Sequence, residues 1–141
     1  MIRIIVIVVI VVLIGIQFIP VSRINPPVTG EIKAPESVMK VLRNSCYDCH
    51  SNESIWPWYS KVAPVSWLIA DDVNEAREHM NFSEWQSYSA EDRAEDIEEI
   101  WEEVDEGEMP LWFYLPLHPE ARLSDKDKET IKNWVKSGAP Q

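Results

Sequence analysis

The stretch Cys46-Tyr47-Asp48-Cys49-His50 contains both cysteines of the chain. Two thiols three positions apart, followed directly by a histidine, form the spacing at which a protein attaches c-type haem. The thiols can bond to the two vinyl groups along one edge of the ring, and the histidine then lies beneath the ring as an iron ligand. The motif therefore predicts one covalently attached haem c, held by Cys46 and Cys49, with His50 coordinating the iron.

Two other chemistries use paired cysteines. A zinc site needs four ligands. His79 and His118 could complete such a set with the two cysteines, but His50 would then have no role. A thioredoxin-like redox pair needs a preceding strand in a βαβ unit, and the sequence has no strand pattern there. A thiol or zinc module stays a hypothesis, whereas haem accounts for every residue of the motif.

The iron needs a second axial ligand if the haem is to carry electrons without binding a substrate. The side chains that can supply it are Met80, Met109, His79 and His118. We favour Met109, because it follows the helix stop at Gly107 and precedes Pro110, which lacks an N–H and holds the chain extended. A thioether on such a loop can be presented to the face of a haem. The other three side chains remain alternatives.

The N-terminal run Ile4–Ile19 is apolar and is interrupted only by Gly15 and Gln17. As a helix it would be about 24 Å long, slightly short of the ~30 Å hydrocarbon core of a bilayer. The run ends without the small-residue site at which a signal peptide is cleaved. We therefore expect residues 1–23 to be an uncleaved signal-anchor with a transmembrane helix; a cleaved signal peptide is the alternative.

The motif also predicts the topology. In bacteria, haem is attached covalently on the outer side of the inner membrane. We therefore expect a single-pass protein of the inner (cytoplasmic) membrane, with its soluble domain in the periplasm. Residues 24–35 contain Asn25-Pro26-Pro27 and Thr29-Gly30, which favour extended chain and predict a linker.

Residues 36–141 have helical patterns and no useful alternation of polar and apolar residues. Helices are expected from Pro35 to Cys46, from Pro64 to about His79, from Ser89 to Gly107 and from Ser124 to Gly138. The fold class is therefore all-α, a small cytochrome c-like helical domain wrapped around one haem.

The charge of the chain is strongly acidic, with 24 acids against 13 Lys and Arg and a formal net charge of −11. A surface of this sign repels phosphates, which argues against a nucleic-acid partner. Eleven of the acids lie between Glu91 and Glu108. Most of them form one polar helix face, which is ordinarily just solvated. The same face could dock a basic redox partner by electrostatic steering.

Several further segments resemble the bacterial haem-binding domain family of small single-haem proteins. The segments are Cys46–Glu53, Trp56–Tyr59, Ala63–Trp67, Arg77–His79, Asn81–Ser83, Glu106–Pro110 and His118–Ser124. The resemblance implies a c-type haem protein and covers nearly all of the chain after the apolar run. The Met-Pro pair and final helix also resemble the second half of class I cytochromes c, which implies that Met109 is the distal ligand. The chain departs from that pattern by a Trp-rich insert after His50.

These observations predict a membrane-anchored c-type cytochrome that transfers single electrons to or from a redox partner protein. An iron with both axial positions filled has no site for a substrate, so we expect an electron carrier and not an enzyme. The alternative is a peroxidase-like haem enzyme subunit, or a gas or redox sensor, with an open distal position. The sequence leaves the oligomeric state open.

Overall fold

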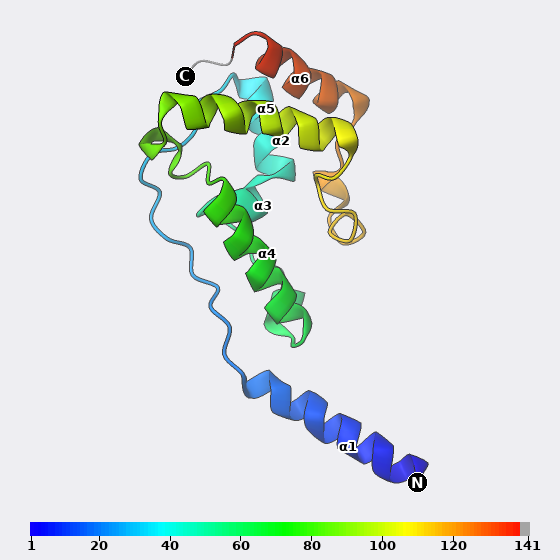
Figure 1. Ribbon diagram of the computed structural model, residues 1–141. Coiled ribbons are helices and arrows are strands. Elements are labelled where there is room, and N and C mark those ends of the chain that lie inside the picture. The colour runs from blue at the N-terminus through cyan, green and yellow to red at the C-terminus, as the bar shows by residue number, and fades with distance from the viewer. Residues whose placement is uncertain (139–141) are drawn as a thin grey trace.

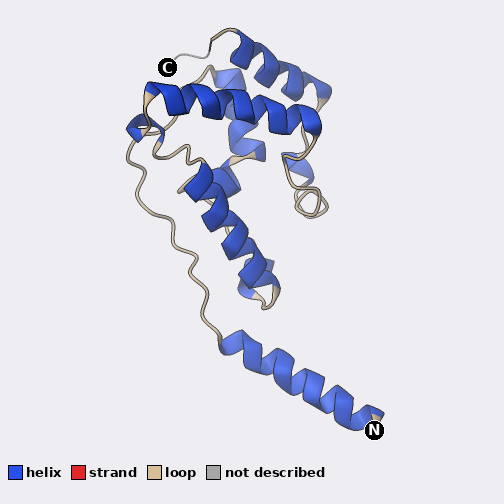
Figure 2. Cartoon of the chain, in the orientation of Figure 1, coloured by secondary structure: helices blue, strands red, loops and turns tan. Residues whose placement is uncertain are grey.

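The computed structural model describes residues 1–138, and this part of the chain consists of helices and loops without a strand (Figures 1 and 2). The α-helices are α1 (Ile2–Gly15), α2 (Glu36–Ser45), α3 (Tyr47–His50), α4 (Val65–His79), α5 (Ala90–Glu106) and α6 (Asp125–Lys136). Short 3-10 helices are η1 (Ile16–Phe18), η2 (Trp58–Lys61), η3 (Trp85–Ser87) and η4 (Pro119–Ala121). The predicted all-α fold class is confirmed for the described residues. The predicted domain end at 141 lies outside them.

The ends of the two long C-terminal helices follow from local chemistry. The Ser89 hydroxyl accepts the Asp92 N–H at 3.1 Å, and the Asp92 carboxylate accepts the Ser89 N–H in return. Ser124 and Asp127 repeat this capping box at the start of α6. At the other end of α5, Gly107 takes the left-handed conformation, with φ of 80°, that favours glycine. The predicted starts of both helices and the predicted end of α5 are confirmed, whereas α6 ends at Lys136, with Ser137 as its C-cap, slightly before the predicted stop at Gly138.

A hydrophobic core joins α2, α5 and α6 to the segment that follows α4. Its members include Val38, Leu42, Phe82, Trp85, Ile97, Ile100, Ile131 and Trp134. In Figure 1, α5 and α6 lie at one end of the domain, and α4 runs from that region toward α1. The short helix α3 packs against both α2 and α4, so the Cys-Tyr-Asp-Cys-His motif lies between the core and α4.

The N-terminal helix differs from the predicted membrane span. No helix within residues 1–138 is both long enough and apolar enough to cross a membrane, so the predicted transmembrane helix is not supported. The physical reason is length, because α1 ends at Gly15 and the chain tightens into η1. The 14 residues of α1 span about 21 Å, against about 30 Å of hydrocarbon. No residue of α1 is buried.

The segment expected as a linker is extended, and part of it is bonded to the domain. The N–H groups of Thr29 and Gly30 both donate to the Ser83 carbonyl, at 3.1 and 3.0 Å. Ile32 is buried in the core and donates its N–H to the Phe82 carbonyl. Gly30 is required by close approach, because a Cβ there would lie 2.6 Å from the Cβ of Gln86. The end of this segment therefore belongs to the packed domain.

Candidate functional site

The predicted haem-attachment residues share one helical turn. Cys46 is the N-cap of α3, and Cys49 and His50 lie inside that helix. The His50 N–H donates to the Cys46 carbonyl at 2.9 Å, which closes the turn around the three side chains. The Cys46 N–H in turn donates to the Leu42 carbonyl of α2 at 2.8 Å. The motif is therefore fixed directly to a helix whose apolar face lies in the core.

The imidazole of His50 is oriented by a backbone carbonyl. Its Nδ1 lies 3.1 Å from the carbonyl oxygen of Met80. Because a carbonyl can only accept, Nδ1 carries the proton and donates it, and the lone pair is left on Nε2. Desolvation lowers the pKa of His50, which favours the neutral ring. A neutral imidazole with one nitrogen fixed by a carbonyl and the other bearing a lone pair is the form that ligates a metal.

A buried polar network holds the segment that supplies this carbonyl. The Phe82 N–H donates to the His50 carbonyl at 2.8 Å, so the two segments are bonded in both directions. The buried side chain of Asn81 donates to the Asn52 amide oxygen at 2.8 Å. The Asn52 N–H donates to the Ser83 hydroxyl at 2.9 Å. Residues 80–83 are therefore fixed against His50 and the residues that follow it.

The two cysteines are unpaired and are poor thiolates. Desolvation raises the pKa of Cys46 to about 12 and that of Cys49 to about 11. Both groups are neutral thiols near pH 7, whereas a redox-active pair or a zinc site uses thiolates. Within residues 1–138, no group of three or more His, Cys, Asp or Glu side chains is arranged to hold a metal ion. The structure gives no support to the zinc and thiol alternatives.

The loop that carries Met109 is tied to the motif. The Met109 N–H donates to the Glu103 carbonyl at 3.1 Å, so this residue stays close to the end of α5. Farther along the loop, the Tyr114 hydroxyl donates to the Asp48 carboxylate at 2.7 Å. Asp48 lies between the two cysteines in sequence. Desolvation and the bond to Asp48 raise the pKa of Tyr114, so the phenol remains a proton donor.

A second tie on the same loop occupies His118. Its Nε2 lies 2.5 Å from the Tyr59 hydroxyl, and its Nδ1 lies 3.0 Å from the Glu120 carboxylate. The ring also stacks on Tyr114, with centroids 4.0 Å apart and planes 5° apart. Both ring nitrogens of His118 are thus engaged, and neither is available to coordinate an iron.

The remaining candidate ligands also have other partners. His79 is exposed at the end of α4 and places its Nε2 2.8 Å from the Glu99 carboxylate. Met80 is buried in the core cluster. Met109 is half-buried and has no place in that cluster. Of the four candidates, Met109, and His79 through its Nδ1, have a donor atom that is neither paired with another side chain nor packed in the core.

Comparison with known proteins gives a family for the chain. The sequence pattern of the haem-binding domain matches residues 11–137. The chain belongs to the haem-binding domain family. No curated protein and no solved structure matches the sequence. The family resemblance described from the sequence is confirmed, and haem binding is the activity that the family supports.

The residues of this haem-binding domain fit the group that its family implies. A haem needs an imidazole with a free nitrogen, and His50 has one by virtue of its bond to Met80. The macrocycle is a flat apolar surface that needs apolar walls. Exposed apolar side chains are present on the loop after Met109, where Trp112 is 79% exposed and Phe113 and Leu117 are also exposed. The haem-binding domain thus has unpaired donor atoms and uncovered apolar surface on segments that are bonded to each other.

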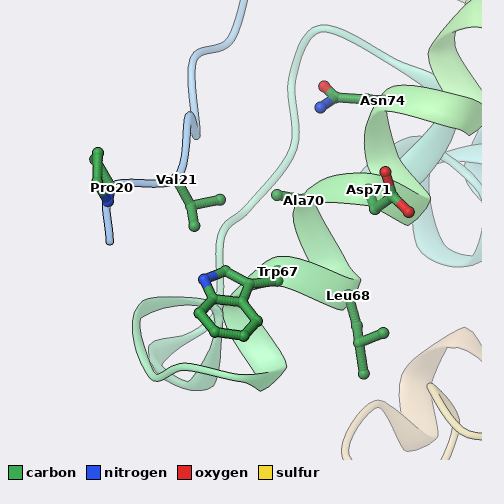
Figure 3. A pocket seen from close by; sticks show the side chains of 7 residues that line it. All are labelled: Pro20, Val21, Trp67, Leu68, Ala70, Asp71 and Asn74. Carbon is green, nitrogen blue, oxygen red and sulfur yellow. The ribbon is translucent and has the colours of Figure 1, made fainter. Parts of the chain in front are cut away.

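The hollow in Figure 3 is separate from these residues. It lies between the chain at Pro20 and Val21 and the helix α4, where Trp67 and Leu68 form part of its wall. Its remaining lining residues are Ala70, Asp71 and Asn74. None of the predicted site residues lines it.

Two parts of the haem-binding domain's site are not visible in the sequence. The carbonyl of Met80 is a backbone group, and nothing in a sequence marks which carbonyl a histidine will meet. Asp48 occupies a variable position of the motif, so its bond with Tyr114 carries no pattern either. An acid between the cysteines and a tyrosine five residues after Met109 are the only traces, and neither is specific.

Proposed function

We propose that this haem-binding domain holds one haem c through Cys46 and Cys49 and transfers single electrons. The observation that supports the proposal is the bond from His50 Nδ1 to the Met80 carbonyl, which leaves the lone pair of Nε2 for an iron. The haem iron supplies the chemistry, by changing its oxidation state by one electron. The residues around it orient the ligand and exclude water.

The covalent attachment is supported by the state of the thiols. Both are free, lie on one turn and remain protonated near neutral pH. A thioether forms when the S–H adds across a vinyl double bond, with the sulfur going to one carbon and the hydrogen to the other. This addition needs no oxidant, so two reduced thiols are the form that the reaction uses.

Met109 is proposed as the distal ligand. His118 has both ring nitrogens bonded, to Tyr59 and Glu120, and Met80 is in the core, whereas His79 has its Nε2 bonded to Glu99. Met109 lies on a loop that is bonded to the motif through Tyr114. With both axial positions filled, the iron has no open site, so the proposed role is an electron carrier and not an enzyme. The order of a Met-Pro loop and a final helix supports a cytochrome c-like arrangement.

We propose further that α1 inserts into a membrane and that the domain lies on the periplasmic side. All residues of α1 and η1 are apolar except for Arg3, Gly15 and Gln17, and none is buried in the structure. Helix α1 and the short η1 together extend about 27 Å. Thirteen exposed apolar side chains on one helical segment are costly in water, and a lipid phase would cover them.

The redox partner is proposed to be a basic protein that docks on α5. Arg93 is the one cation of this helix, and seven of its acids are exposed, namely Glu91, Asp92, Glu95, Glu98, Glu102, Asp105 and Glu106. A surface of one sign raises the rate of encounter with a partner of the other sign by roughly 10–10³-fold at low salt. The proposal predicts that electron exchange with a basic partner slows as ionic strength rises.

Absorption spectra of the purified holoprotein in both oxidation states test the proposed function. We expect a six-coordinate low-spin haem that is reduced and reoxidised reversibly, without binding carbon monoxide. A high-spin spectrum that shifts on addition of carbon monoxide or peroxide would favour the open-site alternative, a peroxidase-like enzyme or a gas sensor. The absence of a Soret band would reject both functions.

A further inference from the structure

We propose that the end of the domain next to α1 is a second membrane-contacting surface, one that rests on anionic lipid headgroups. This bilayer-facing surface consists of Trp58, Lys61, Val62 and Val65, together with Arg23 of the preceding chain. The inference rests on the proposed insertion of α1 in a membrane, and it adds how the domain sits on that membrane.

The first observation is that the domain is bonded to the chain that leaves α1. The Gln17 side chain pairs with both backbone groups of Ala63: its Nε2 donates to the carbonyl, and its Oε1 accepts the N–H, each at 3.0 Å. The Arg23 guanidinium donates to the Ser60 carbonyl at 3.1 Å. These contacts hold η2 and the start of α4 at the end of α1. The domain is therefore not suspended on a free tether.

Figures 1 and 3 show the same proximity of the domain to the end of α1. In Figure 1 the N-terminal end of α4 is the part of the domain that approaches α1, and α5 lies at the opposite end. In Figure 3 the chain at Pro20 and Val21 passes beside Trp67 of α4. If α1 is in the bilayer, η2 and the first turn of α4 lie at the interface.

The second observation is that this end of the domain exposes apolar side chains. Trp58 is 75% exposed, Val62 is 43% exposed and Val65 is 41% exposed. Phe18 and Ile19, between α1 and Arg23, are also exposed. The apolar surface thus continues from α1 onto the domain. Tryptophan is enriched at membrane–water interfaces, because the ring is apolar and its N–H can bond to headgroups.

The third observation is the distribution of charge. The 24 acids of the chain all lie between residues 31 and 53 or between residues 71 and 129. Residues 1–30 and 54–70 contain no acid, and they contain the cations Arg3, Arg23 and Lys61. Arg23 and Lys61 thus lie near the end of α1 in segments of the chain without acids, whereas Arg3 is at the other end of that helix and the nearby Asp71 lines the hollow beside Val21. The positive sign of Arg23 and Lys61 complements anionic headgroups and does not complement a basic protein partner.

The proposed orientation on the membrane leaves α5 accessible to a redox partner. With the bilayer-facing surface on the lipid, α5 and its exposed acids lie at the end of the domain farthest from the membrane (Figure 1). The headgroups repel those acids and so favour the same orientation. A basic partner then reaches α5 without competition from the lipid.

A labelled single-cysteine addition tests the contact in the full-length holoprotein. Val62→Cys would carry an environment-sensitive fluorophore, and the chain would be reconstituted in vesicles of phosphatidylcholine with phosphatidylglycerol. Glu129→Cys on α6 is the matched control position, and the chain without an added cysteine measures background labelling of Cys46 and Cys49. We expect a blue-shifted emission that is quenched by nitroxide lipids at position 62, and an aqueous emission at position 129.

The outcomes separate this inference from the one on which it rests. If the chain floats with the vesicles but position 62 remains aqueous, α1 inserts and the bilayer-facing surface is rejected. If the chain does not float with vesicles, both the membrane insertion and the bilayer-facing surface are rejected. If position 62 is shielded to the same degree in a self-associated chain without vesicles, the surface contacts a second copy and the lipid assignment is overturned.

A pair of charge-removing variants tests the contact with anionic headgroups. Lys61→Gln should lower the ratio of shielded to aqueous label at position 62 by about fivefold in anionic vesicles. The same substitution at the opposite end, Lys126→Gln, should leave the ratio unchanged, and pure phosphatidylcholine should abolish the difference between the two variants. An equal effect of the two substitutions would contradict the headgroup contact.

Discussion

The two sides of the proposed haem site are built differently. On the His50 side, a buried network of side chains and backbone groups fixes the segment that orients the ligand. On the Met109 side, a loop with exposed aromatic side chains is bonded to the motif through Tyr114 and Asp48, and to Tyr59 of η2 through His118. The difference indicates that the imidazole is held before haem arrives, whereas the second ligand depends on a loop that haem itself would cover.

The largest expected effect concerns the ligand on the network side. His50→Ala should abolish the low-spin spectrum, because the iron loses the nitrogen that the Met80 carbonyl leaves free. His79→Ala is the matched control, since that imidazole is exposed and bonded to Glu99. Spectra of both variants, purified in parallel, check the prediction. A low-spin spectrum that is lost in His79→Ala and kept in His50→Ala would show that His79, and not His50, is the iron ligand.

The next effect concerns the loop side. Met109→Ala should open the iron to carbon monoxide and water while leaving the fold largely intact. Met109→His should stay low-spin and lower the reduction potential, because a soft thioether favours ferrous iron more than a second imidazole does. Met39→Ala, at a half-buried methionine packed against the core, is the control and should change neither property. An unchanged spectrum in Met109→Ala would transfer the search to Met80 and His79.

A third prediction compares the stability of the two sides. Asn81→Ala leaves the Asn52 amide oxygen and the Ser83 N–H without partners in a buried place. We expect a loss of about 1–3 kcal/mol in the free energy of unfolding. Tyr114→Phe removes one half-buried bond and should lose only about 0.5–1.5 kcal/mol. Denaturant unfolding of the two variants gives the comparison, and a larger loss for Tyr114→Phe would mean that the loop is the better-fixed side.

The smallest effect is a dependence of stability on pH. The bond to the Glu99 carboxylate raises the pKa of His79 above its ordinary value near 6.5. A histidine whose pKa is higher in the folded chain than in the unfolded chain stabilises the fold. This contribution is complete at pH values below the unfolded pKa and is lost as pH rises through the folded pKa. His79 should therefore contribute a small loss of stability as pH rises above about 6.5, opposite in sign to the contribution of His50, whose pKa is lowered by burial. His79→Gln should lack this loss, which thermal unfolding at several pH values can measure.

Much of the fold could be predicted from the sequence, because its helices carry local signals. Ser89 and Ser124 cap helices with acids three residues later, and Gly107 supplies the left-handed stop. The length of α1 was not predictable from its composition. An apolar run gives no sign of where the helix ends, and the contact of Gln17 with Ala63 is 46 positions away in sequence.

The candidate site likewise has a part that the sequence predicts and a part that it does not. Cys46, Cys49 and His50 are adjacent in the chain, so their spacing alone indicates the chemistry. The carbonyl of Met80 and the bond between Asp48 and Tyr114 join residues 30 and 66 positions apart. Such contacts depend on how α3 packs against α4 and on the path of the loop after α5. No local sequence pattern encodes this packing or this loop path. The role of Met109 as an iron ligand depends on the same loop path and therefore stays a prediction.

Acid–acetone extraction of the purified holoprotein tests the central claim most directly. If Cys46 and Cys49 bind the haem as thioethers, the haem colour should stay with the precipitated polypeptide, and its mass should exceed that of the bare chain by one haem. Cys49→Ala should leave at most one thioether and reduce the yield of holoprotein. Haem that passes entirely into the acetone, with the wild-type polypeptide at its bare mass, would contradict the c-type assignment.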